Sequence, residues 1–270
     1  MSKKKPSLIG ETARTVIFAV IIAFFIRVFA YEPFNIPSGS MIPTLLVGDY
    51  LFVSKFSYGY SRYSLPWGLA VIDDRILASP PKRGDVVVFK LPKDNQTDYI
   101  KRVIGLPGDR IQVIRGILQI NGTAVTRRKL GTITLASYGG YKRQAVEYIE
   151  TLPNGVEHRI WEESDEDCLD NTPVYVVPQG HYFMMGDNRD SSQDSRVFRD
   201  LRTAGSCPEK SDTEIDISTP VIWAVGFVPF RNLVGRAEFL FFSHDEGASL
   251  FKPWTWPTAI RYRRIFNGVE

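Results

Sequence analysis

An apolar segment near the start of the chain constrains its fold more than any other feature. Residues 15–31 read TVIFAVIIAFFIRVFAY, and Arg27 is their only charged residue. The uninterrupted apolar run Val16–Ile26 has 11 residues, fewer than the ~20 that cross a bilayer as a helix. We expect the segment to continue past Arg27 to Tyr31, because an arginine can reach the lipid headgroups while its stem stays buried.

Three interpretations of this segment compete: a buried core helix, a cleaved signal peptide and an uncleaved signal anchor. Residues 28–30 (VFA) resemble the small-x-small pattern of a cleavage site. The segment is apolar on all sides and follows a lysine cluster at 3–5, which favours the anchor. Basic residues mark the cytoplasmic side of a membrane. We therefore expect a cytoplasmic basic N-terminus at 1–14, a transmembrane signal anchor at 15–31 and export of the chain from about residue 32.

Beyond residue 32 the sequence predicts a mainly β protein. Short runs of β-branched and apolar residues are bounded by turn residues such as those of Pro107–Asp109 and Asn121-Gly122. The predicted strands are 85–89, 99–104, 111–114, 117–120, 174–177, 182–185, 221–228 and 238–242. We expect one exported β-rich domain over 32–245, with loop or insertion segments at about 121–173 and 198–220.

The charges and the metal-binding residue types of the chain exclude several classes of function. The net charge is +3, and residues 1–14 supply all of it, so we expect no nucleic-acid partner. Two cysteines, three histidines and the absence of a His-Glu-x-x-His motif argue against a zinc site. We expect no metal and no other cofactor. The acidic run at 162–167 (EESDED) is interpreted as a solvated loop.

The end of the chain, residues 246–270, combines aromatic residues with lysine and arginine. This mixture is typical of a membrane–water interface, and we expect a membrane-proximal tail. An amphipathic segment packed on the domain is the alternative. Cys168 and Cys207 both lie on the expected exported side, where disulfides persist, and the sequence leaves open whether they pair.

Two segments can supply the chemistry of a serine hydrolase that lacks a histidine base. In the first, Pro37 and Pro43 stiffen the backbone around Ser38–Ser40, where a glycine permits unusual dihedral angles. Such a turn can expose a hydroxyl and direct its own amide at an oxyanion. In the second, Lys101 lies on an apolar face of a predicted strand, where loss of hydration lowers the pKa of a lysine. A neutral lysine can serve as general base. An ordinary loop and a lysine at a sheet edge are the alternative interpretations.

Four segments follow the apolar segment in a fixed order. They are Pro37–Thr44 (PSGSMIPT), Arg83–Phe89 (RGDVVVF), Tyr99–Asp109 (YIKRVIGLPGD) and Gly186–Arg196 (GDNRDSSQDSR). Together they resemble the signature motifs of bacterial type I signal peptidases, over roughly residues 15–114 and 174–242. The resemblance implies an antiparallel β-sheet catalytic domain of the signal-peptidase type behind one transmembrane helix. The commonest proteobacterial form of that family has two membrane helices, and only one is visible here.

The resemblance also implies roles for individual residues. Ser40 would be the nucleophile and Lys101 the general base. Ser38 would add its hydroxyl to the Ser40 amide in an oxyanion hole, and Ser192 would hydrogen-bond and orient the Lys101 amine. The shallow pockets for small substrate residues at −1 and −3 would be lined by Phe34, Ile36 and Ile100. Structural ion pairs would be formed by Arg102, Asp187, Asp194 and Arg196.

We therefore expect a membrane-bound serine endopeptidase that removes signal peptides from exported preproteins. Its partners would be these preproteins and the lipid bilayer, in a bacterial inner membrane, with a single membrane pass and a periplasmic catalytic domain. Ser40 lies ten residues past Ala30, within ~33–36 Å even when the chain is fully extended, so the site would lie close to the bilayer. Two alternatives stay open: a Ser-Lys processing peptidase dedicated to a single pilus or conjugation-type precursor, and a non-catalytic anchored β-domain for envelope assembly.

Overall fold

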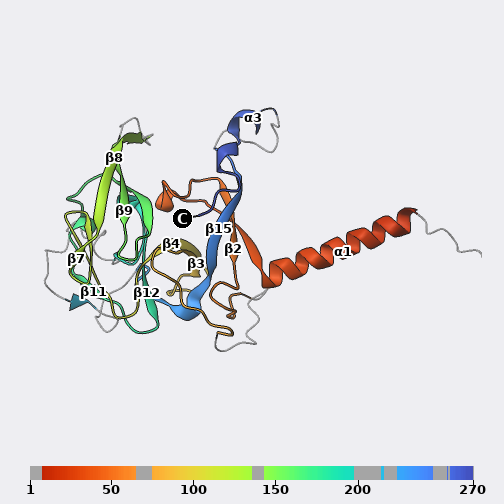
Figure 1. Ribbon diagram of the computed structural model, residues 1–270, viewed down its shortest axis with the longest axis horizontal. Helices are drawn as coiled ribbons and strands as arrows, with labels where there is room; N and C mark the ends of the chain where they lie inside the picture. Colours follow the sequence, from red (N-terminus) through yellow and green to blue (C-terminus); the bar gives the residue numbers. More distant parts are fainter. Residues whose placement is uncertain are drawn as a thin grey trace, which may run out of the picture.

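One long helix precedes a body of three β-sheets (Figure 1). The computed structural model describes residues 8–64, 75–135, 143–197, 214–215, 224–245, 254 and 256–269. All strand pairs in the three sheets are antiparallel except one, in the part of the chain that the structure describes. The expected mainly β architecture behind a single apolar helix is confirmed.

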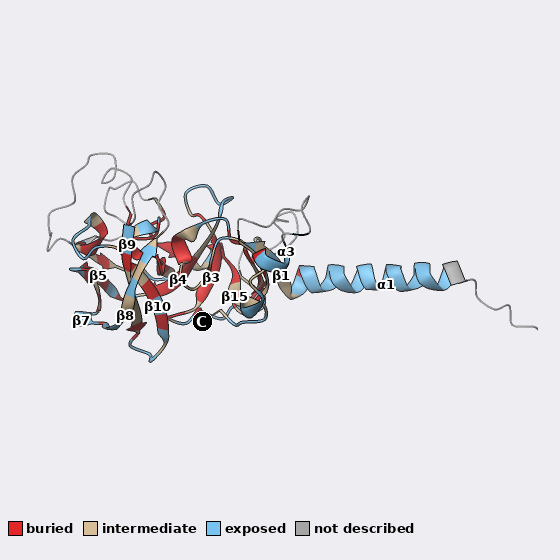
Figure 2. Ribbon diagram, turned by 90° about the horizontal axis from the view of Figure 1, so that it is seen from above, coloured by how far each residue is buried: buried red, intermediate tan, exposed pale blue. Residues whose placement is uncertain are grey.

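The helix, α1 (Leu8–Phe29), is long and apolar enough to span a membrane over Gly10–Phe29. It extends away from the β-sheets, and of residues 10–29 only Val28 is buried (Figure 2). The helix begins before residue 15 and ends before residue 31, so its bounds differ from those expected for the membrane anchor, 15–31, which stay a prediction. A helix tolerates charged residues well, so Glu11 in its first turn does not end it.

The largest sheet joins strands from both ends of the chain. Its order is β1 (Tyr31–Asn35), β2 (Asp49–Ser54), β15 (Leu233–Ser243), β3 (Val86–Lys90), β4 (Asp98–Gly105), β12 (His181–Met185) and β14 (Val228–Pro229). Because β3 and β4 pair from Val86↔Arg102 to Lys90↔Asp98, Lys101 lies near the middle of the sheet. This placement surrounds it with packed side chains.

Two smaller sheets lie on the side of the β-body away from α1 (Figures 1 and 2). The five-stranded sheet has the order β13 (Glu214–Ile215), β11 (Val174–Val176), β5 (Arg110–Ile114), β6 (Ile117–Ile120) and β7 (Thr123–Ala124). The three-stranded sheet has the order β10 (Glu157–Glu162), β9 (Arg143–Thr151) and β8 (Thr126–Leu135). The expected loop at 121–173 is therefore wrong, because β8, β9 and β10 occupy much of it. These strands carry many exposed charged residues, so they lack the apolar alternation by which half-buried strands are recognised.

Two further expectations concern the segment before β14. The predicted strand 221–228 was wrong over residues 224–227, which contain bends and in which Gly226 adopts a φ of 68°. Residues 221–223 lie outside the described residues. Of the expected insertion at 198–220, only β13 is described, and it pairs in parallel with β11.

The described part of the tail packs back onto the large sheet. Arg264 forms an ion pair with Asp49, with its Nη2 2.6 Å from Asp49 Oδ2. The backbone amide of Leu240 donates to the carbonyl of Asn267 at 2.9 Å. Trp254 and Tyr262 are nevertheless 73% and 59% exposed. The packed segment that the sequence left as an alternative is thus present, and it still presents aromatic side chains to its surroundings.

Candidate active site

The Ser40 hydroxyl and the Lys101 amine meet at the edge of a groove. Ser40 lies in the short 3-10 helix η1 (Gly39–Met41), and Lys101 lies on β4. Lys101 Nζ is 2.6 Å from Ser40 Oγ and donates a second hydrogen bond to the Ile100 carbonyl at 2.9 Å. Two residues separated by 61 positions in the sequence are therefore in direct contact.

The surroundings of Lys101 favour its neutral form. The side chain is buried, and the loss of hydration lowers the pKa of Lys101 from 10.5 to about 8, although Asp194 and Asp187 act in the opposite direction. The amine also lies 5.5 Å from the ring centroid of Tyr99. A lysine with this pKa can accept a proton near neutral pH, as a general base must.

The segment after β12 supports the backbone of the serine turn. The Asn188 amide donates to the Ser40 carbonyl at 3.1 Å, and Asn188 Nδ2 donates to the Gly39 carbonyl at 3.0 Å. A Cβ atom added at Gly186 would collide with the Ser192 side chain and with the Ser40 carbonyl oxygen. These contacts hold η1 against the Gly186–Arg196 segment. Gly39 itself has no positive φ, so the expected unusual glycine conformation is not used.

Ser38 and Ser192, the two serines expected to assist the dyad, differ in their surroundings. Ser38 is exposed, and its Oγ is 3.5 Å from Ser40 Oγ, at the outer limit of a hydrogen bond. Ser192 Oγ is fully buried and has no hydrogen-bond partner among the described residues. The predicted hydrogen bond from Ser192 to the Lys101 amine is therefore absent in this structure, in which that amine bonds to Ser40 and to the Ile100 carbonyl.

A groove with a volume of about 660 Å³ opens beside Ser40 and Lys101. The three residues predicted to form substrate pockets, Phe34, Ile36 and Ile100, all line it. Among the described residues that line this groove there is no histidine. Three residues to which the sequence analysis assigned no role also line the groove, namely Arg143, Ser191 and Gln193. Nothing in the sequence marks Arg143, because it lies on a strand that was expected to be a loop.

Two buried ion pairs involve residues of β4 and of the Gly186–Arg196 segment. Arg102 and Asp187 form a bidentate pair at 2.9 and 2.8 Å, and the Thr44 hydroxyl donates to Asp187 at 2.5 Å. Asp194 and Arg196 form a second bidentate pair at 3.0 and 2.9 Å. Burial alone would raise the pKa of Asp187, but the Arg102 guanidinium holds it below its usual range. All four residues predicted as structural ion pairs thus take part in such pairs.

A third buried pair, which the sequence did not indicate, extends this network. Arg189 forms a bidentate pair with Glu150 of β9, with Nη1 3.0 Å from Glu150 Oε1. His158 Nε2 lies 3.3 Å from Glu150 Oε2. Burial, followed by the nearby Arg102 charge, lowers the pKa of His158 below its usual value. Glu150 and His158 lie in the segment expected to be loop, so no strand pattern pointed to them.

The cysteines are partly described. Cys168 takes part in a disulfide bond, and Cys207, the second of the chain's two cysteines, lies outside the described residues. Cys168 begins the 3-10 helix η3 (Cys168–Asp170). The disulfide bond of Cys168 therefore anchors η3, which lies close to the end of β10.

Comparison with known proteins gives the family. Residues 9–242 match the family described as signal peptidase, peptidase S26. The chain belongs to this family. The signal peptidase I of Rickettsia canadensis (strain McKiel) is 39% identical over 269 residues, which cover 93% of this chain and 90% of that protein. The signal peptidase I of Rickettsia akari (strain Hartford) is also 39% identical, over 271 residues, with the same coverage.

One solved structure, a signal peptidase I from Enterococcus faecalis V583, is 22% identical and covers 58% of this chain and 97% of its own. Its TM-score of 0.28 is too low to support a comparison of details. Membership of the signal peptidase family supports peptidase activity and signal-peptide cleavage. These matches favour that function over a peptidase dedicated to one precursor.

Proposed function

We propose that this chain is a membrane-anchored serine endopeptidase in which Ser40 and Lys101 cleave signal peptides from preproteins. One observation carries the proposal: a buried lysine amine with a lowered pKa lies 2.6 Å from a serine hydroxyl at the edge of a groove. An amine in this position can accept the proton of the serine hydroxyl and so activate the serine oxygen for attack on a peptide bond. The arrangement also argues against a non-catalytic β-domain, because burying an amine without a function would only cost stability.

The first half of the reaction forms an acyl-enzyme. Neutral Lys101 accepts the proton of the Ser40 hydroxyl while Oγ attacks the scissile carbonyl carbon of the substrate. The resulting oxyanion receives hydrogen bonds from the Ser40 amide and the Ser38 hydroxyl. When the intermediate collapses, the C–N bond breaks and the Lys101 ammonium gives its proton to the leaving amine. The signal peptide is then held as an ester on Ser40.

The second half of the reaction releases the signal peptide. Lys101, neutral again, accepts a proton from a water molecule that attacks the ester carbonyl. The same oxyanion site stabilises the second tetrahedral intermediate. Its collapse breaks the C–O bond to Ser40, and the Lys101 ammonium returns a proton to the serine oxygen. The products are a signal peptide with a free carboxylate and the regenerated dyad.

The groove accounts for the proposed choice of small residues at −1 and −3. Phe34, Ile36 and Ile100 line the groove beside the dyad, and Ile36 is buried, so its side chain has little room to move. A branched or aromatic −1 residue would contact these side chains and displace the scissile carbonyl. A displacement of 1 Å can reduce the rate ~100-fold.

The location of the site follows from α1. We propose that residues 1–14 are cytoplasmic, that the apolar helix anchors the chain in the bacterial inner membrane, and that the β-rich domain faces the periplasm. The exposed aromatic residues of the tail then lie at the membrane–water interface. The first strand of the large sheet, β1, begins at Tyr31, directly after α1. This short connection keeps Ser40 close to the bilayer.

The test is cleavage of a purified preprotein by the full-length enzyme in detergent, with the cleaved bond identified by mass spectrometry. Wild type is expected to cut after the small −1 residue, and Ser40→Ala is expected to lower kcat/KM by about 10⁴-fold or more. Ser57→Ala, which removes a serine hydroxyl outside the groove, serves as the matched control.

A second arm of the same experiment replaces Ala by Leu at −1 of the preprotein. We expect a fall in kcat/KM of ~100-fold. Near-wild-type cleavage by Ser40→Ala would exclude Ser40 as the nucleophile. Efficient cleavage after Leu would instead exclude the pocket assignment and leave the dyad in place.

A further inference from the structure

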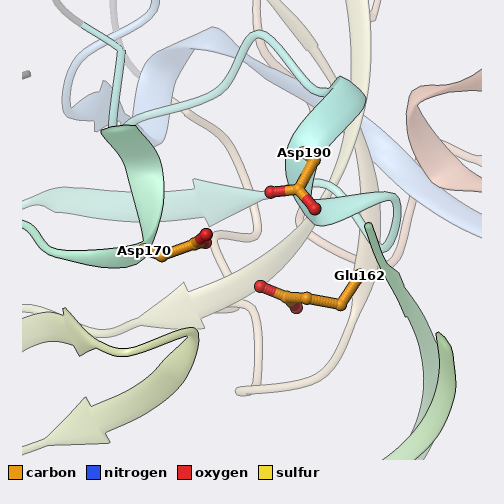
Figure 3. Close-up of side chains that lie close together, drawn as sticks. All are labelled: Glu162, Asp170 and Asp190. Carbon is orange, nitrogen blue, oxygen red and sulfur yellow. The ribbon is translucent and has the colours of Figure 1, made fainter. Parts of the chain in front are cut away.

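Three carboxylates from different segments converge beside the active-site segment (Figure 3). Glu162 ends β10, Asp170 ends η3, and Asp190 lies in the 3-10 helix η4 (Arg189–Ser191). One oxygen of each lies within 4.8 Å of the others. Figure 3 shows the three side chains directed into the same small space. The sequence suggested a solvated acidic loop here, which is wrong for Glu162, because its side chain is buried.

The inward oxygens are buried and lack partners. Glu162 is 3% exposed and Asp170 is 0% exposed. Glu162 Oε2, Asp170 Oδ1 and Asp190 Oδ1 have no hydrogen-bond partner among the described residues. Buried polar atoms are nearly always satisfied, and an exception calls for a ligand, an ion or a functional cause.

The second oxygens of the two aspartates are held by backbone amides. The Asp167 amide donates to Asp170 Oδ2 at 2.7 Å. The amides of Glu163 and Ser164 donate to Asp190 Oδ2 at 2.5 and 3.1 Å. Burial raises the pKa of Asp170 and Asp190, and these hydrogen bonds act in the opposite direction by favouring the charged carboxylates. They also fix the orientation of each group, so that the free oxygen points inward.

The arginines nearest to these carboxylates are engaged elsewhere. Arg189 makes a bidentate pair with Glu150, and Arg196 makes a bidentate pair with Asp194. Each guanidinium is therefore neutralised by a carboxylate outside the cluster. The negative charge of the cluster is left without a matching positive charge in the part of the chain that the structure describes.

We propose that Glu162, Asp170 and Asp190 bind a divalent metal cation of the size of calcium. Calcium takes oxygen ligands at about 2.3–2.6 Å, so two ligands on opposite sides of the ion are about 4.6–5.2 Å apart. Three oxygens within 4.8 Å of one another fit around such an ion. Magnesium, with ligands at about 2.0–2.1 Å and a strict octahedral geometry, is the competing ion that the test includes. Waters would complete the coordination.

The bound cation would reinforce the link that the Glu163 and Ser164 amides already make between the end of β10 and η4. It would connect the end of β10 and the disulfide-anchored η3 to η4. Asp190 lies between Asn188, which bonds the serine turn, and Ser192. The site takes no part in the hydrolytic steps, so the proposal does not depend on Ser40 or Lys101 being catalytic.

The test is thermal unfolding of the full-length protein in detergent after treatment with a chelator, with CaCl₂ or MgCl₂ added in the millimolar range. A ligand that binds only the folded state raises the melting temperature, and at about 100 times its Kd we expect a rise of ~5 °C or more with calcium. Glu162→Gln and Asp190→Asn are expected to abolish the rise. Each amide keeps the shape of the side chain, and the amide oxygen that Asp190→Asn introduces can still accept the backbone hydrogen bonds. Because removal of charge relieves repulsion, both variants should fold.

Glu157→Gln is the matched control, since Glu157 is an exposed residue at the other end of β10. It should retain the full calcium response. Isothermal titration with calcium should give about one site per chain in the wild type and none in Glu162→Gln. The proposal is overturned if no divalent cation raises the melting temperature of the wild type. It is equally overturned if the two amide variants respond as the wild type does, because the ion then binds elsewhere.

Discussion

At the scale of single residues, the site depends on the position of one amine. A free lysine titrates near ~10.4, so fewer than about one molecule in a thousand would carry a neutral amine at pH 7. With the pKa of Lys101 at about 8, roughly one molecule in ten is neutral at that pH. Burial thus increases the active fraction by about two orders of magnitude. Arginine could not replace Lys101 as a base, because a guanidinium does not deprotonate in proteins.

Gly186 makes a specific prediction at this scale. A methyl group at this position would collide with the Ser192 side chain and with the Ser40 carbonyl. Gly186→Ala should therefore displace the serine turn and lower kcat/KM by ~100-fold, with a smaller effect on KM. Gly131→Ala, on β8 with open space around it and no positive φ, is the control for general effects of adding a methyl group. Full activity of Gly186→Ala would show that the turn is not held in the way described.

Single residues also show the limits of sequence analysis. Ser40 and Lys101 stand in segments whose order and composition resemble known motifs, so their meeting could be predicted. Ser192 was assigned a hydrogen bond that the structure does not form, because a motif does not specify the distances and directions between its side chains. Glu162 was expected in solvent, because a run of acidic letters does not reveal that its first member ends a buried strand.

At the scale of elements, the Arg102–Asp187 pair joins β4 to the segment after β12. Its atoms are fully desolvated, and Thr44 adds a link to the serine turn. Removing one partner leaves a buried charge without compensation, which typically costs about 3–5 kcal/mol. We expect Asp187→Asn to lower the free energy of unfolding by about this amount, as measured by urea titration.

Lys90 and Asp98 supply the matched control for this prediction. They form an ion pair that also involves β4, here with β3, but both side chains are partly exposed. Lys90→Ala should therefore cost about 1 kcal/mol or less. An equally small loss for Asp187→Asn would contradict the structural role that we assign to the buried pair.

The strands that could be predicted share one property. β3, β4, β5, β6 and β12 are rich in apolar residues and are bounded by turn residues, and the sequence indicated all of them. β8 is mostly exposed and β9 carries charged residues along its length, so the pairing of the two strands rather than apolar burial defines them. That pairing is a tertiary feature, and no local pattern reveals it.

At the scale of the whole molecule, the chain divides into an exposed helix and a β-body (Figure 2). The apolar surface of α1 would be unfavourable in water, and a bilayer removes it from water. The presence of this helix was predictable from composition alone. Its limits were not, because apolar letters mark the part inside the membrane and not the ends of the hydrogen-bonded helix.

The proposed topology is tested by protease added to intact spheroplasts. With the N-terminus inside, the β-rich domain should be digested from outside, and a protected fragment containing α1 should remain. A cytoplasmic protein of the same cells should stay intact, as the control for lysis. If the domain survives until the membrane is permeabilised, the orientation is the reverse.

The central claim is that Lys101 is the base for Ser40, and the pH dependence of kcat/KM tests it most directly. The rates would be measured between about pH 6 and pH 10 on a substrate without titrating groups near the cleaved bond, with Lys101→Arg measured in parallel. Because the neutral amine is the reactive form, kcat/KM should rise with pH through an apparent pKa of about 8, and Lys101→Arg should be inactive at every pH. A rise centred near ~6.5 would indicate a histidine base in place of Lys101. That result, or near-wild-type cleavage by Lys101→Arg, would contradict the account.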